Sequence, residues 1–156
     1  MRRGSIKSVM INKMNELNRM GGIVSVCLYP ISEVKYCFVQ YGKVYFKSEW
    51  SGLVLPLLSF RGTPNSDNDE KSSGVVYSHS LSLPIRYKPS WMELYLRHGF
   101  VAVVTSSTGV RWVFGTKRYP LFGDCKPHIG TTPSDGEYYL LSLSAECDTE
   151  VSPLAD

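Results

Sequence analysis

The sequence contains little that would commit it to a membrane or to secretion. No segment approaches the roughly 20 consecutive apolar residues of a membrane-spanning helix, so no membrane partner is expected. Met1-Arg2-Arg3 is basic, but polar and charged residues follow before any long apolar run. A secretory signal is therefore not predicted, and we expect the protein to be made and kept in a cytoplasm-like compartment.

Cysteine is scarce and widely spaced. The four cysteines form no C-x-x-C pair, and a domain of 156 residues buries enough surface to fold without disulfides. We therefore expect reduced and mostly buried thiols. The run Cys125-Lys126-Pro127-His128 has the spacing of half a zinc site without a matching second half, and Asp67-Asn68-Asp69-Glu70 lacks the glycine and the later glutamate of a calcium loop. No metal site is predicted.

Catalytic motifs are also missing. The chain has no G-x-S-x-G, no glycine-rich phosphate loop, and no Cys-His pair with a credible orienting acid. His79 stands on the apolar side of a predicted strand and is interpreted as a hydrogen-bonded core or interface histidine, and His98 as a cation at a helix end. The sequence predicts a protein that is not an enzyme, with no catalytic residues and no cofactor.

The charge of the chain is slightly positive. A net charge of +3 is too small to indicate nucleic acid or an anionic membrane. Basic residues gather at the N-terminus, where residues 1–21 carry Arg2, Arg3 and Lys7 among five cations against one acid. This segment is interpreted as a flexible basic arm or, alternatively, as a short amphipathic helix that docks on a neighbour.

Alternating side chains are the clearest positive signal. Residues 75–87 place apolar or aromatic residues and His79 at odd positions, and mostly Ser, Pro or Arg at even positions, which predicts a strand with its odd face in a core. Residues 137–147 repeat the pattern. The strand at 100–105 is apolar on both faces and should therefore be central.

A hairpin is predicted over residues 34–46, around Tyr41-Gly42-Lys43. Its predicted core residues are Tyr36, Phe38, Val44 and Phe46.

The fold predicted from these patterns is mainly β, a sandwich or barrel of about seven strands with one short helix inserted near residues 91–98. Ser90-Trp91-Met92-Glu93 reads as the capping box of that helix, and Gly99 as its closing residue. A single β-rich domain is expected over residues 22–147. It should contain a mobile polar loop at 61–74 and an irregular stretch at 115–136, and residues 148–156 should form a C-terminal tail.

An alternative hypothesis is that the protein binds nucleic acid. Aromatic residues between 112 and 122 alternate with Arg111, Lys117 and Arg118, as on barrels that bind single strands. The competing interpretation, which we favour, places Trp112 and Phe114 inward on one strand face and leaves the cations on a solvated rim.

The order of features also resembles a known group of proteins. Five features follow one another over about half of the chain. They are an alternating strand from Val76, a short helix, an apolar strand at 100–105, the strand Val110-Arg111-Trp112-Val113-Phe114, and a closing strand before Glu150-Val151-Ser152-Pro153-Leu154. This order resembles small structural proteins encoded in tailed phages and prophages of gut Bacteroidales, near tail and head-tail connector genes.

The resemblance implies a non-enzymatic virion part, made in the host cytoplasm, that assembles as a ring through β-rich domains and extended arms. Its expected partners are other copies of itself and neighbouring virion proteins. The candidate interaction residues are Arg2, Arg3, Lys7, Arg111, Lys117 and Arg118. A nucleic-acid-binding β-barrel is the alternative function, and a small hydrolase or lysis factor is a third.

Overall fold

The computed structural model describes residues 23–57, 63–71, 74–129 and 137–155. Its elements follow one another along the chain as β1 (Ile23–Pro30), η1 (Ile31–Glu33), β2 (Val34–Gln40), β3 (Lys43–Ser48), β4 (Leu53–Val54), β5 (Thr63–Lys71), β6 (Gly74–Ile85), α2 (Met92–Tyr95), β7 (Phe100–Ser106), β8 (Arg111–Phe114), β9 (Phe122–Ile129), β10 (Glu137–Cys147) and β11 (Ser152–Pro153).

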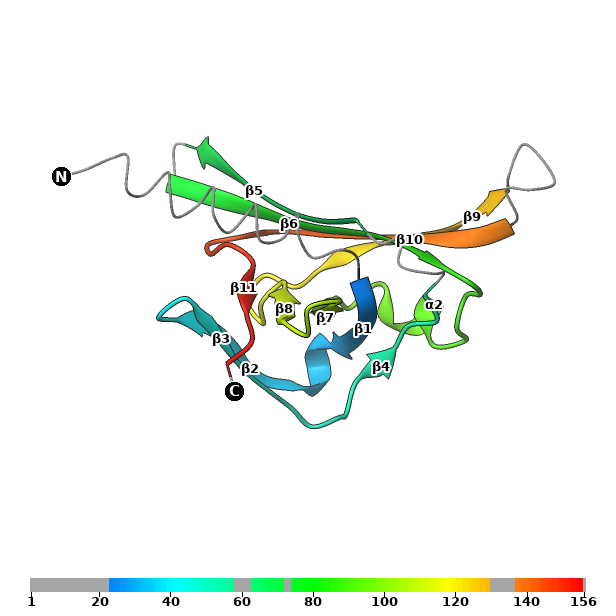
Figure 1. The fold of residues 1–156 in the computed structure, drawn as a ribbon, viewed down its shortest axis with the longest axis horizontal. Coiled ribbons are helices and arrows are strands. Elements are labelled where there is room, and N and C mark those ends of the chain that lie inside the picture. The colour runs from blue at the N-terminus through cyan, green and yellow to red at the C-terminus, as the bar shows by residue number, and fades with distance from the viewer. Residues whose placement is uncertain (1–22, 58–62, 72–73, 130–136, 156) are drawn as a thin grey trace.

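The strands form three antiparallel sheets. One sheet has the order β11-β8-β7-β1-β4, a second has the order β5-β6-β10-β9, and β2 and β3 form a hairpin of their own. Figure 1 shows the long strands of the second sheet lying across the first, with the hairpin beyond the first sheet. The prediction of a mainly β, sandwich-like fold is confirmed, although the described residues contain eleven strands rather than about seven.

Two buried clusters separate these layers. The larger lies between the two big sheets and includes Phe100, Phe114, Leu141 and Leu143. The smaller lies between the first sheet and the hairpin. Strand β7 contributes alternate side chains to both clusters, which explains why both of its faces are apolar. Its position in the middle of the five-stranded sheet confirms that it is central.

The alternating strand at 75–87 is confirmed as β6. It pairs with β10 in a register that sets Leu143 opposite Leu81 and Leu141 opposite Leu83. These four leucines face the first sheet and are almost fully buried. Hydrophobic burial on one side of the sheet therefore fixes the register of both strands.

The prediction of a mobile polar loop at 61–74 is wrong for residues 63–71, which form β5. This strand pairs with β6 from Thr63 opposite Ser82 to Lys71 opposite Gly74. The error has a physical cause: β5 is an end strand of its sheet, where backbone hydrogen bonds hold a strand in place and polar sequences are common. Residues 61–62 and 72–73 lie outside the described residues.

Two other segments that were predicted to lack regular structure contain strands. Residues 115–136 contain strand β9, which pairs with β10 over its whole length. The predicted tail at 148–156 is wrong for its described residues, because Ser152 and Pro153 pair with β8, and Leu154 forms a parallel bridge with Val44 of β3. The predicted arm at 1–21 lies outside the described residues.

The helix is shorter than predicted. It spans Met92–Tyr95 instead of 91–98. No side chain forms a capping hydrogen bond at its start, so the prediction of a capping box is wrong. Glu93 instead pairs with the ammonium group of Lys88. Gly99 does close the turn that follows, at φ +91°, and a Cβ there would lie 2.9 Å from Cβ of Pro120, so glycine is needed for close packing as well as conformation.

Candidate functional site

The outer face of the β2–β3 hairpin is the most distinctive surface among the described residues. A two-residue turn, Tyr41 at φ 55° and Gly42 at φ 73°, joins the strands. Positive φ at both turn positions matches the right-handed twist of a hairpin. This turn sets Gln40 opposite Lys43 and Phe38 opposite Tyr45.

The register assigns the two faces of the hairpin. Val34, Cys37 and Val44 are buried against the first sheet, and Val39 and Phe46 pack partly against the same cluster. Tyr36, Phe38 and Tyr45 point the other way, with 42%, 47% and 38% of their surface exposed. The prediction that Val44 is a core residue is confirmed, and Phe46 packs on that core.

The same prediction is wrong for Tyr36 and Phe38. The register shifts between Val34 and Tyr36, so Lys35 is an extra residue in β2 and the alternation changes phase there. Beyond this bulge the even-numbered side chains of β2 face outward.

The three outward rings form one cluster. The centroids of Phe38 and Tyr45 lie 5.5 Å apart with an interplanar angle of 18°, and those of Tyr36 and Phe38 lie 5.7 Å apart at 42°. Lys43 and Lys47 are exposed and share this face, because residues 43, 45 and 47 alternate with the buried positions of β3. The result is an aromatic and basic surface, which we call the hairpin face: Tyr36, Phe38, Lys43, Tyr45 and Lys47.

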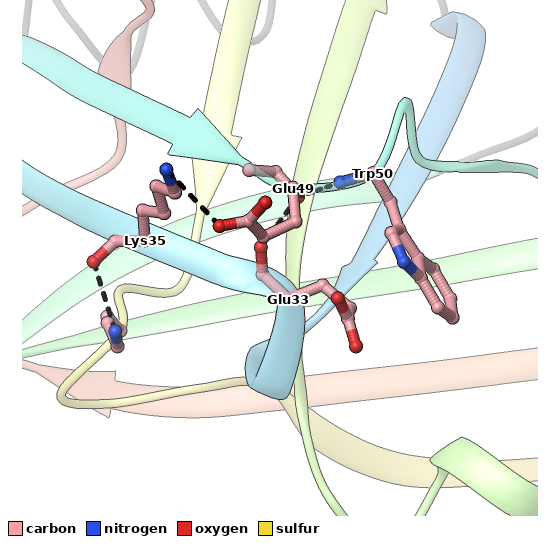
Figure 2. A network of polar contacts seen from close by, with 6 residues as sticks. Glu33, Lys35, Glu49 and Trp50 are labelled. Atoms are coloured by element: carbon pink, nitrogen blue, oxygen red, sulfur yellow. Dashed lines mark hydrogen bonds and ion pairs between the residues drawn. The ribbon is translucent and has the colours of Figure 1, made fainter.

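Polar contacts fasten the base of the hairpin. Lys35 forms an ion pair with Glu49 at 3.2 Å, and its backbone carbonyl accepts a hydrogen bond from Nζ of Lys117 at 3.0 Å. Figure 2 shows this arrangement beside Glu33, whose carbonyl accepts the backbone N–H of Glu49 at 2.8 Å. These contacts join β2, β3 and the segment after β8.

Trp50 follows this network along the chain. Its backbone N–H donates to Oγ of Ser48 at 3.2 Å, and its ring meets the edge of Tyr95 with centroids 6.1 Å apart. The base of the hairpin is thereby connected to helix α2.

The structure describes three of the candidate residues predicted from the sequence, each in its own surroundings. Lys117 lies beside Lys35 at the edge of β2, Arg118 lies over the ring of Tyr119 at 5.5 Å, and Arg111 is exposed on β8. Trp112 and Phe114 are buried between the sheets, which confirms the interpretation that they point inward. Arg2, Arg3 and Lys7 lie outside the described residues.

His79 is confirmed as a core histidine. It is 1% exposed, its Nδ1 accepts the backbone N–H of Gly115 at 2.9 Å, and its Nε2 donates to the carbonyl of Thr149 at 2.6 Å. These partners assign a neutral ring with the proton on Nε2. Burial lowers the pKa of His79, and the Thr149 carbonyl and the carboxylates of Asp148 and Glu150 oppose this effect.

The cysteines are free thiols, as predicted, and all except the half-buried Cys27 are buried. Burial raises the pKa of Cys37 and of Cys147 to about 12. Both groups are therefore protonated at neutral pH and unreactive. Within the described ranges, no three His, Cys, Asp or Glu side chains gather as metal ligands would.

Sequence reasoning missed most of the hairpin face. The signal was present: with a two-residue turn at Tyr41-Gly42, inward Val44 requires Tyr45 and its partner Phe38 to point outward. Lys43 and Lys47 alternate in phase with Tyr45, and charged residues at these positions also indicate that this side of the hairpin faces solvent.

Comparisons with known proteins add no assignment, because no protein-family model, curated protein or solved structure matches the chain. Among the described residues, no helix is long and apolar enough to cross a membrane.

Proposed function

We propose that the protein is a structural component of a tailed-phage virion, located at the tail or the head-tail connector. In this proposal it works by docking to copies of itself and to neighbouring virion proteins. The proposal begins from the resemblance in feature order, whose expectation of a β-rich domain agrees with the sandwich-like fold.

The observation that carries the proposal is a group of exposed apolar side chains at one end of the sandwich. Val54 on β4 is 67% exposed and Leu94 on α2 is 63% exposed, and Tyr87 and Trp50 are also exposed. Strand β4 is the end strand of the five-stranded sheet. We call this surface the β4–α2 end: Trp50, Val54, Tyr87 and Leu94.

Contacts inside the chain hold these segments together. The ring of Trp50 touches that of Tyr95, and the backbone N–H of Arg86 donates to the carbonyl of Pro56 at 2.9 Å. Leu57 and Ile85 form an antiparallel bridge. The segments of the β4–α2 end therefore contact one another, and exposed apolar side chains on neighbouring segments favour a protein partner.

The direct test is mass spectrometry of purified phage particles from the host that carries the gene. The proposal predicts a constant number of copies of this chain per particle. Its absence from particles in which capsid and tail proteins are both detected would contradict the proposal.

A pair of variants tests the docking surface. Val54→Lys combined with Leu94→Glu should lower incorporation into particles at least tenfold, while leaving the fold intact because both side chains are already exposed. Val110→Lys is the control, since Val110 is an exposed apolar residue in the turn between β7 and β8. Equal incorporation of the double variant and the wild type would refute docking through the β4–α2 end.

A further inference from the structure

We infer that the hairpin face binds single-stranded nucleic acid. This inference stands apart from the proposed role in the virion, because it concerns a different surface and fails under a different experiment. It also differs from the nucleic-acid hypothesis drawn from the sequence, in which two of the four aromatic residues, Trp112 and Phe114, are buried.

The rings supply the first part of the argument. Phe38 contacts both Tyr36 and Tyr45, and the three rings remain between 38% and 47% exposed. An isolated exposed aromatic residue needs no explanation, but three that follow one another across one face of the hairpin leave a continuous apolar surface in water. Nucleobases stack on such rings whatever their sequence, with a free energy of about 1–3 kcal/mol per base.

Charge supplies the second part. Residues 34–48 contain Lys35, Lys43 and Lys47 and no acidic residue. Lys35 is paired with Glu49, but Lys43 and Lys47 are exposed and have no ion-pair partner within the part of the chain that the structure describes. They flank the rings on the same face, where they would meet phosphate groups while the rings meet bases.

Base stacking favours a single strand over a duplex. Bases in a duplex follow one another about every 3.4 Å along each strand and hide their faces in the stack. A ligand that stacks on these rings must present bases with free faces. An unpaired strand does so, and a duplex does not.

Charge also argues against other occupants. A second copy of the hairpin would bring Lys43 and Lys47 against the same residues of its neighbour, or near them, and like charges at close range are unfavourable. The segment 1–21 carries five cations and one acid and would be repelled in the same way. The lysines therefore favour an anionic partner, and the aromatic rings favour bases over carboxylates.

The face is also held in place before any ligand arrives. The inner side of the hairpin is buried against β7 and β8, and the Lys35–Glu49 pair and the Lys117 hydrogen bond fix its base. A rigid platform loses little conformational entropy on binding.

Fluorescence anisotropy with labelled 15-mers of deoxythymidine and of uridine, at 20 and 200 mM salt, tests the inference on the full chain. We expect saturable binding at low salt that weakens at high salt. Phe38→Leu combined with Tyr45→Leu keeps apolar side chains but removes the stacking rings, and should weaken binding at least tenfold.

Charge variants form the second arm. Lys43→Glu with Lys47→Glu should weaken binding at least tenfold, and loss of two phosphate contacts should reduce the salt slope by about 1.4. Arg86→Glu with Lys126→Glu makes the same change in net charge at exposed residues elsewhere, and should leave affinity within about threefold of wild type. Circular dichroism and thermal melting verify that each variant folds.

Three results would overturn the inference. These are no binding at 20 mM salt, an equal loss in the two charge variants, and equal competition by poly-glutamate or by duplex DNA of the same length. The first result would show that the protein does not bind single-stranded nucleic acid. The second would show that binding does not depend on the hairpin face, and the third would show a general attraction for anions.

Discussion

The two buried clusters on either side of β7 hold very different amounts of apolar surface. Among the residues that the structure describes, the cluster between the large sheets contains eighteen buried residues, with Phe100, Trp112 and Phe114 among them. The cluster beneath the hairpin contains six on the same basis, which are five valines and Cys37. Because stabilisation grows with buried apolar area, the sandwich should unfold as the main cooperative unit while the hairpin opens at lower free energy.

The largest effect should come from the larger cluster. Phe114→Ala removes a fully buried ring that also lies against His79, with centroids 6.3 Å apart. We expect a loss of about 4 kcal/mol in the free energy of unfolding, as is usual for such a truncation. Urea denaturation followed by tryptophan fluorescence measures it. A loss below about 1 kcal/mol would show that the inter-sheet cluster does not dominate stability.

A smaller and more local effect is expected beneath the hairpin. Val44→Ala removes two methyl groups from the smaller cluster and should cost about 2 kcal/mol. Hydrogen exchange with mass spectrometry should show faster exchange in peptides covering β2 and β3 than in those covering β7. Uniform acceleration throughout the chain would instead mean that the two clusters unfold together.

The smallest effect is a pH dependence carried by His79, which joins β6 to the segment after β8 and to residue 149. Burial lowers its folded pKa below the value near 6.5 of an unfolded histidine. The unfolded state therefore binds more protons as the pH falls below about 6.5. The stabilisation is complete above that pH and is lost as the pH falls toward the folded pKa, by up to about 1.4 kcal/mol per pH unit.

The measurement compares urea stability of the wild type and His79→Gln between pH 5 and 7.5. The variant should show the shallower dependence on pH. If His79→Gln keeps the slope of the wild type, the buried ring does not titrate with folding.

Much of the sandwich could be predicted because burial on one side of a strand leaves a two-residue period in the sequence. That period located β6 and β10, and two apolar faces placed β7 at the centre. The failures have physical causes of their own. Strand β5 pairs with β6 along its whole length at the end of its sheet, and its polar sequence carries no apolar pattern.

The hairpin face was hidden by a different effect. Both sides of β2 are rich in apolar and aromatic residues, so composition alone could not tell inside from outside. The extra residue at Lys35 then reversed the alternation. The length of the turn at Tyr41-Gly42 determines which rings reach solvent. That length is hard to predict from the sequence, because tyrosine is an unusual residue at a turn position with positive φ.

The bridge between Val44 and Leu154 has a consequence for the order of folding. These residues are 110 positions apart (154 minus 44), and the backbone N–H of Ala155 also donates to the carbonyl of Val44. A ribosome therefore releases β3 long before the segment that covers its edge exists. Contacts of such long sequence separation form slowly, so a nascent chain passes through a period in which this edge is open to pairing with other strands.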